Sequence, residues 1–247
     1  IATKNLISVS QDPIQEPSFS PDGSKVAYVH NRNLFIKDLQ SGTLTQVTND
    51  GNDYIINGIT DWVYEEEFSF VRSFHWNSSG SHLAFLRFDE SDVPVFSMDL
   101  YGEKLYQTQQ VFRYPKAGEN NSVVSLHVYD LNQKKTNNIA LKNAYYIPRM
   151  QFTNDANLLS VQTLNRHQND LRLLYVDVQN GSVKEVLRES DEAYVDVHDN
   201  LTFLNDHSFI WSSESDGFNH LYHYSKQGKL INQITNGKWE VTDYYGY

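Results

Sequence analysis

The chain has 247 residues, a formal net charge of −11 at pH 7 and 39% hydrophobic residues. This apolar content is enough to build a core, which excludes an intrinsically disordered chain. The negative charge argues against nucleic-acid partners, because binding to phosphates needs a basic surface. The sequence has no cysteine, which excludes disulfide bonds and thiolate chemistry. Since it starts at Ile1 without an initiator methionine or a signal peptide, we expect a mature or excised piece of a longer protein.

A pattern of short strands and tight turns recurs along the chain. In residues 18–48, an aromatic residue is followed by a polar turn and an alternating strand. A second strand ending in Asp-Leu, a Ser-Gly turn and a third strand come next. Related patterns follow, the last one incomplete, at residues 75–89 continued by 124–141, 150–187, 201–235 and 238–241.

The strands and turns together favour a β-propeller. Apolar residues alternate at Val26 and Tyr28, and again at Leu171, Leu173 and Tyr175, as half-buried strands require. Units of about 40 to 50 residues with three or four strands are typical of propeller blades. A β-sandwich also has short strands and turns, but it would not repeat one pattern along the whole chain. We therefore predict an all-β fold, a partial β-propeller of about four to five blades.

Two insertions interrupt the repeats, at about 51–72 and 90–122. Insertions between strands lie at loop ends, where a rigid scaffold often carries functional residues. We expect both insertions to belong to a single partial propeller domain that spans residues 1–247.

The first insertion contains "DWVYEEEFSF" (61–70), which places three glutamates between aromatic residues. Asp61 can cap the N-terminus of a short helix, and negative charge in a first turn complements the helix dipole. Trp62 and Phe68 would then pack against the adjacent sheet. On this interpretation the segment is an ordinary surface helix, with Glu65 in solvent.

A second interpretation gives Glu66 and Glu67 a binding role. Successive residues of a helix point about 100° apart, so these two carboxylates can flank one point in space. Two close carboxylates repel each other, and a primary ammonium group relieves this repulsion because its three N–H donors can bind both. A glycosidase pair is a third interpretation. Its carboxyl groups must face each other across a bond at about 5 Å or more, which adjacent residues do not.

The segment "NGITDWVYEEEF" (57–68) resembles the double-glutamate motif of the dipeptidyl peptidase IV family, which belongs to the prolyl oligopeptidase clan of serine peptidases. Further segments resemble the same family in the expected order and extend the resemblance over most of the chain: "LAFLRFDESDVP" (83–94), "YPKAG" (114–118), "SDGFNHLY" (215–222) and "GKWEV" (237–241). The resemblance implies part of an N-terminal propeller of about eight blades, with a short inserted helix and an extended hairpin arm.

The resemblance also implies a substrate-binding role for particular residues. In this family the last two glutamates of the motif, here Glu66 and Glu67, bind the N-terminal ammonium group of the substrate. This selects for release of an Xaa-Pro or Xaa-Ala dipeptide. Phe218 matches a phenylalanine that lines the substrate cavity. Asn219 stands where the well-known mammalian member has arginine, so the chain departs from the family at that ionic contact.

The catalytic serine, aspartate and histidine of the family lie in a C-terminal α/β-hydrolase domain. No Gly-x-Ser-x-Gly nucleophile elbow occurs in this chain, so we expect it to lack the catalytic domain and to be inactive alone. The resemblance implies three partners: a peptide with a free N-terminus, the protein's own hydrolase domain, and a second copy bound through the arm at about 94–118. It also implies an exported protein, periplasmic or on the surface of a bacterium.

The histidines give no sign of a metal site. His220 and His223 are three residues apart, which on a strand points them to opposite faces, and the sequence offers no cysteine. We expect neither a metal nor another cofactor. A non-catalytic interaction propeller, such as a pseudo-peptidase, remains the alternative function, because the missing domain is where such proteins differ.

Overall fold

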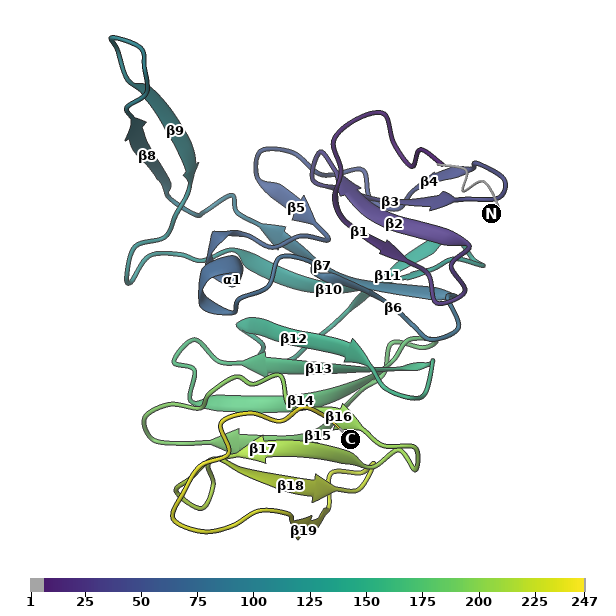
Figure 1. The fold of residues 1–247 in the computed structure, drawn as a ribbon, viewed down its shortest axis with the longest axis vertical. Helices are drawn as coiled ribbons and strands as arrows, with labels where there is room; N and C mark the ends of the chain where they lie inside the picture. The colour runs from purple at the N-terminus through teal and green to yellow at the C-terminus, as the bar shows by residue number, and fades with distance from the viewer. Residues whose placement is uncertain (1–6, 247) are drawn as a thin grey trace, which may run out of the picture. The chain divides into compact units, whose positions relative to one another are not determined.

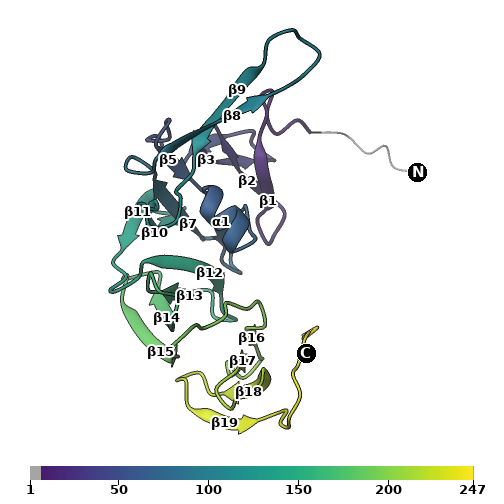
Figure 2. The same cartoon turned by 90° about the vertical axis from the view of Figure 1, so that its left-hand side faces the viewer.

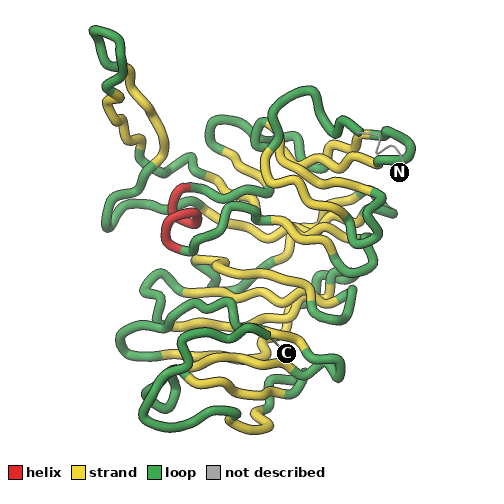
Figure 3. Tube along the Cα trace, in the orientation of Figure 1, coloured by secondary structure: helices red, strands yellow, loops and turns green. Residues whose placement is uncertain are grey.

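The computed structural model describes residues 7–246, and these residues form β-strands together with one short helix, α1 (Trp62–Glu67) (Figures 1 and 3). The helix lies inside the first predicted insertion, as expected. Within residues 7–246, no helix has the length and apolar character needed to cross a lipid bilayer.

Two compact units make up the chain. Unit 1 comprises Ile1–Phe74 and Leu83–Thr136, and unit 2 comprises His75–His82 and Asn137–Tyr247. The single propeller domain over residues 1–247 stays a prediction.

Four sheets have the size of propeller blades. The first has the order β1-β2-β3-β4: β1 (Gln15–Phe19), β2 (Lys25–His30), β3 (Asn33–Asp38) and β4 (Leu44–Gln46). The second has the order β11-β10-β7-β5, with β6 paired to β7: β5 (Ile55–Asn57), β6 (Phe74–Trp76), β7 (His82–Asp89), β10 (Val123–Asp130) and β11 (Lys135–Ile139). The third has the order β12-β13-β14-β15: β12 (Tyr146–Phe152), β13 (Leu158–Leu164), β14 (Asp170–Asp177) and β15 (Val183–Ser190). The fourth has the order β16-β17-β18-β19: β16 (Thr202–Phe203), β17 (Phe209–Ser213), β18 (His220–Tyr224) and β19 (Leu230–Gln233).

The predicted all-β fold of partial propeller blades is confirmed by these sheets. In the first, third and fourth sheets, strands that follow one another in the chain pair antiparallel, which is the strand order of a blade. The start of a fifth repeat at 238–241 forms no strand.

The inner strands are more buried than the predicted alternation implies. In β14, Leu173 on one face is fully buried, and Leu174 on the other face is only 5% exposed. Within unit 2, the fourth sheet covers part of the third, because the ring of Tyr175 lies 6.2 Å from that of Phe203 in β16. Strands covered on both faces read as continuous apolar runs, and β14 is buried at the predicted alternate positions and also at Leu174 and Val176 between and beyond them.

The second insertion forms a two-stranded antiparallel hairpin, β8 (Val95–Leu100) and β9 (Thr108–Arg113). It leads away from β7 and returns to β10 (Figures 1 and 2). We call residues 94–118 the arm. The expected extended hairpin is therefore present.

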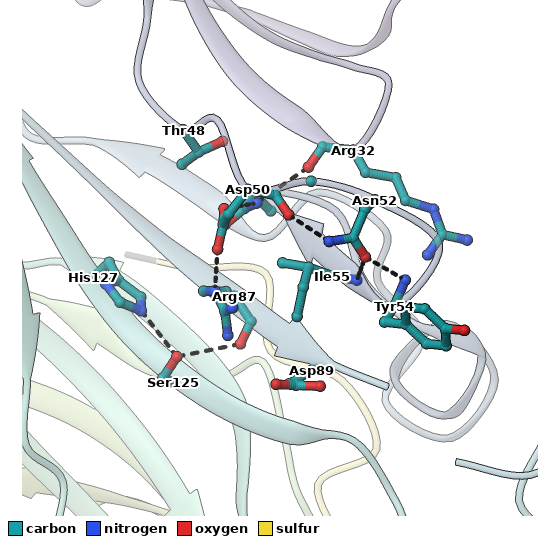
Figure 4. A network of polar contacts seen from close by, with 12 residues as sticks. Arg32, Thr48, Asp50, Asn52, Tyr54, Ile55, Arg87, Asp89, Ser125 and His127 are labelled. Carbon is teal, nitrogen blue, oxygen red and sulfur yellow. Dashed lines mark hydrogen bonds and ion pairs between the residues drawn. The ribbon is translucent and has the colours of Figure 1, made fainter. Parts of the chain in front are cut away.

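A polar network in unit 1 joins the loop after β4 to the second sheet (Figure 4). Asp50 accepts hydrogen bonds from Arg87 Nε at 2.7 Å and from Asn57 Nδ2 at 2.9 Å. Burial alone would raise the pKa of Asp50, but these hydrogen bonds outweigh it and lower the pKa. On the neighbouring strand, Ser125 Oγ lies 2.9 Å from His127 Nε2. Burial, together with the nearby Arg87 guanidinium, lowers the pKa of His127 to about 4.

The chain leaves the second sheet for α1 through Gly58. Its φ of +77° lies in the left-handed region, and a Cβ there would lie 3.0 Å from Val29 Cγ2 and 3.1 Å from Leu34 Cδ1. Beyond it, Thr60 N–H donates to Val71 O at 3.0 Å and closes the stem of the insertion. Glycine is therefore required both by backbone conformation and by space.

We expect Gly58→Ala to lower the free energy of unfolding by about 2–4 kcal/mol, because it adds crowding to the cost of a left-handed alanine. Gly23→Ala is the matched control, since Gly23 has φ +69° but open space around its Cα. The control should cost about 1 kcal/mol. Urea denaturation of the purified variants measures both values, and equal losses would contradict the packing argument.

We expect the stability of the protein to fall between about pH 6.5 and pH 4 through His127. In this window the unfolded chain, with an ordinary imidazole pKa, binds a proton that the buried imidazole of the folded state does not. His127→Phe can still stack on Phe85, whose ring lies 5.2 Å from the imidazole, and it removes this titration. Between pH 7.5 and pH 5, wild type should lose about 1–2 kcal/mol more than the variant. Parallel pH profiles in urea denaturation would refute this expectation.

Candidate functional site

The helix α1 begins with a cap from Asp61, as predicted. The backbone of Asp61 is extended (φ −79°, ψ 178°), and its Oδ1 accepts the Tyr64 N–H at 3.0 Å. Such a cap contributes about 1 kcal/mol. At the other end Phe68 N–H donates to Tyr64 O at 3.2 Å. Ser69 then takes a left-handed φ of +58°, which ends the helix.

One side of α1 is buried against aromatic side chains of unit 1. Tyr64 is only 2% exposed, and its ring lies 4.9 Å from Phe88 of β7 and 5.0 Å from Phe68, both edge-on. Phe68 is 5% exposed, so its predicted burial is confirmed, and its ring packs on Tyr64. Tyr64 is the deeper anchor, which was not predicted from the sequence. The four-residue spacing of Tyr64 and Phe68, which puts both on one face of a helix, is the signal that could have identified it.

Trp62 makes an aromatic contact that was not predicted. It is half-buried, and its ring lies 4.2 Å from that of Tyr114 in the arm. The packing of Trp62 against the sheet stays a prediction. The arm returns past the first turn of α1. The contact between Trp62 and Tyr114 could not be predicted from the periodicity of residues 61–70, because Tyr114 lies outside that segment.

The opposite side of α1 presents the three glutamates to solvent. Glu65 lies in the first turn, where negative charge suits the helix dipole. Glu66 and Glu67 are the last residues of α1, where the dipole disfavours negative charge. Within residues 7–246, no ion pair involves either of them. Two adjacent exposed carboxylates at an unfavourable helix end would be stabilised by a cation.

The cap carboxylate of Asp61 is itself held by a second segment. Asp61 and Ser122 are 5% and 7% exposed, and Ser122 Oγ donates a hydrogen bond to Asp61 Oδ2. Burial raises the pKa of Asp61, while the hydrogen bonds from Ser122 and from the Tyr64 N–H oppose this rise. Both oxygens of the Asp61 carboxylate thus accept hydrogen bonds, one from the first turn of α1 and the other from Ser122.

Phe218 and Asn219 lie in the connection between β17 and β18, in unit 2. Both are half-buried. Asn219 Nδ2 donates to Val241 O at 2.7 Å, and Val241 N–H donates to Asn219 O at 2.8 Å. Asn219 therefore holds the segment near Val241 in place of making an ionic contact. Because Glu66 and Glu67 belong to unit 1, a joint site of all four residues stays a prediction.

Asn219 also lines a cavity of about 410 Å³ in unit 2. Burial raises the pKa of Glu189 in its wall, opposed by hydrogen bonds from Ser213 and Trp211. Burial lowers the pKa of His198, also in the wall, to about 4. Several further acidic and aromatic side chains line it: Asp191, Tyr194, Asp196, Glu214 and Tyr224. Phe218 is not part of this wall.

This cavity was not predicted from the sequence. The stretch "SDEAYVDVHDN" (190–200), from the last residue of β15 toward β16, mixes acidic residues with a tyrosine and a histidine. That composition in a connection between blades was the available signal. That this stretch would line a cavity together with β17 could not be deduced, because the cavity depends on how the third and fourth sheets pack.

His220 and His223, which were predicted to lie on opposite faces of a strand, both form hydrogen bonds. His220 Nδ1 lies 3.1 Å from Thr235 Oγ1, and its Nε2 lies 3.0 Å from Gly237 O. His223 Nε2 lies 2.8 Å from Ser208 Oγ. The described part of the chain brings no three potential metal ligands together.

The chain is similar to dipeptidyl peptidases along nearly its whole length. The crystal structure of Porphyromonas gingivalis dipeptidyl peptidase 4 superposes with a TM-score of 0.92 at 42% identity, over 96% of this chain and 35% of that one. A Schizosaccharomyces pombe protein named "Putative dipeptidyl aminopeptidase C2E11.08" is 29% identical over 98% of this chain and 34% of its own length. A Tuber melanosporum protein named "Probable dipeptidyl-aminopeptidase B" is 31% identical over 92% of this chain and 29% of its own length.

This chain thus spans about a third of the relatives that it matches. The model of the dipeptidyl peptidase IV (DPP IV) N-terminal region matches residues 1–247. The resemblance seen in the double-glutamate motif is confirmed: the chain belongs to the DPP IV N-terminal region family.

Proposed function

We propose that the chain is the substrate-gating, N-terminus-anchoring propeller of a serine-type dipeptidyl peptidase that releases Xaa-Pro and Xaa-Ala dipeptides. One observation carries the proposal. Glu66 and Glu67 are adjacent, exposed and without an ion-pair partner within residues 7–246, at the end of a helix whose other side is buried. This is a suitable receptor for one primary ammonium group.

The anchor would act by position. An ammonium group bound to Glu66 and Glu67 places the substrate's N-terminus at a set point, so that only the second peptide bond reaches the catalytic serine. Binding energy used for orientation lowers the barrier of the chemical step as well as improving affinity. The catalytic residues belong to the hydrolase domain that we propose as a partner of this propeller, and the chain by itself should be inactive.

We assign a supporting role in substrate binding to Phe218 and Asn219. Asn219 lines the acidic cavity of unit 2, and its side chain fixes the segment near Val241. Negative charge around the cavity would attract the positively charged end of an entering peptide.

A second copy of the protein is proposed to bind through the arm, residues 94–118. The arm exposes more apolar side chains than a solvated hairpin needs, and such patches mark interaction sites: Val95, Met98, Leu100, Tyr101, Leu105, Tyr106 and Val111. We also propose that the protein is exported, to the periplasm or the surface of a bacterial cell.

A non-catalytic interaction propeller is the alternative. The exposed apolar arm would serve that role as well. A Gly-x-Ser-x-Gly nucleophile elbow in the sequence that follows Tyr247 would distinguish the two functions, because a pseudo-peptidase differs from the enzyme in the hydrolase domain.

We expect Glu67→Ala in the full-length protein to lower kcat/KM for an Xaa-Pro-anilide by about two orders of magnitude or more, because the ammonium group loses one carboxylate. Glu65→Ala is the matched control, since Glu65 is exposed in the same helix but lies in its first turn. The control should keep nearly full activity, and both variants should keep the wild-type melting temperature. Near-wild-type turnover by Glu67→Ala would rule out the anchoring role.

We expect Leu105→Asp to shift the full-length protein from dimer to monomer. Leu105 is 91% exposed between β8 and β9, and a charge there would be buried in an arm-mediated dimer at a high desolvation cost. Leu44→Asp is the control, because Leu44 is also an exposed leucine of unit 1 but lies outside the arm. Sedimentation velocity measures the association state. An unchanged dimer in Leu105→Asp would show that the arm tip is not the interface.

A further inference from the structure

The start of α1 contacts two segments of unit 1 that are distant from it in sequence. The N-cap Asp61 and the first helical residue Trp62 lie at this start. The returning half of the arm and the residues after it carry Tyr114 and Ser122. Each residue of the first pair contacts one residue of the second.

The first contact is between two aromatic rings. The ring centroids of Trp62 and Tyr114 lie 4.2 Å apart at an interplanar angle of 59°. Tyr114 is itself fixed at the base of the arm, because its N–H donates to Pro94 O at 2.9 Å and its ring lies 5.5 Å from that of Phe96. A displacement of the arm's base would therefore be passed to Trp62.

The second contact is a buried hydrogen bond from Ser122 Oγ to Asp61 Oδ2. The other oxygen of the same carboxylate accepts the Tyr64 N–H and caps α1. Ser122 directly precedes β10 and is anchored by that strand. The carboxylate of Asp61 thus links β10 to the start of the helix.

These contacts matter because α1 is short. A helix of six residues has little stability of its own, so its direction is set by what holds its side chains. Tyr64 packs edge-on against Phe88 and Phe68, and Val63 is buried as well. The two contacts at the start of α1 add restraints on the direction of the helix, and its last residues are Glu66 and Glu67.

We propose that Tyr114 and Ser122 are positioning residues for the paired glutamates. Through Trp62 and Asp61 they set the direction in which α1 presents Glu66 and Glu67 to the substrate's ammonium group. This inference rests on the proposed anchoring function and adds residues that act on the glutamates through Trp62 and Asp61.

The test measures how strongly the full-length protein prefers a ligand with an α-amino group. The probes are an aminoacyl pyrrolidide, which mimics Xaa-Pro, and its des-amino analogue, in which hydrogen replaces the amino group. The inhibition constant of the des-amino analogue divided by that of the aminoacyl pyrrolidide is the amine preference. Tyr114→Ala and Ser122→Ala should each lower this ratio by about tenfold, because misdirected carboxylates bind the ammonium less well. Tyr114→Phe keeps the ring and should restore the wild-type ratio.

The controls separate positioning from general damage. Phe19→Ala and Ser182→Ala remove exposed side chains outside α1 and the arm, and they should leave the ratio unchanged. A variant that is merely less well folded weakens both ligands together, so its ratio also stays at the wild-type value and counts against the proposal. All variants are compared at one association state, checked by sedimentation.

The outcomes distinguish this inference from the proposed function. If Glu67→Ala loses the amine preference while Tyr114→Ala and Ser122→Ala keep it, the positioning role is wrong and the anchoring role stands. If wild type shows no amine preference, or if Glu67→Ala keeps it, the anchoring function itself is wrong.

Discussion

The burial of one side of α1 is the interaction on which the candidate site depends. A six-residue helix is not stable by itself in water, and the packing of Tyr64 on Phe88 of β7 and on Phe68 holds it in place. While these side chains are buried, Glu66 and Glu67 are exposed to solvent. The aromatic residues and the acidic residues of this segment therefore have complementary roles. The aromatic residues hold the helix in place, and in the proposed function the glutamates bind the ammonium group.

Polar side chains complete what the aromatic packing begins. The buried Asp61 caps α1 and accepts a hydrogen bond from Ser122, and the more exposed Asp50 accepts hydrogen bonds from Arg87 (Figure 4) and from Asn57. A buried carboxylate that loses its donors is costly, so Asp61 restrains the segments that donate to it. In unit 2, the amide of Asn219 restrains the segment near Val241 in the same manner. Loops that carry function on a propeller thus obtain their rigidity from a few satisfied polar side chains.

Much of the local structure of the first insertion could be predicted. Asp61 before an aromatic and acidic run was enough to predict a capped helix, and the burial of Phe68 followed from the same pattern. The contact of Trp62 with Tyr114 could not be predicted, because the residues are separated by most of the arm and meet only once β7 and β10 pair. The cavity beside Asn219 has the same explanation, since its wall combines two strand connections of unit 2 with residues of β15, β17 and β18.

The sequence by itself determined the elements that depend on neighbouring residues: the short strands, their turns, the blade repeats, the helix at 62–67 and the paired glutamates. It also carried the motif that identifies the family. Only the tertiary structure decided that both faces of β14 would be covered, that Tyr64 would be the deepest anchor of α1, and that Ser122 would hold Asp61. These features arise from contacts between segments far apart in the chain. The periodicity of apolar residues predicts the structure of one segment, but it does not predict which other segment packs against it.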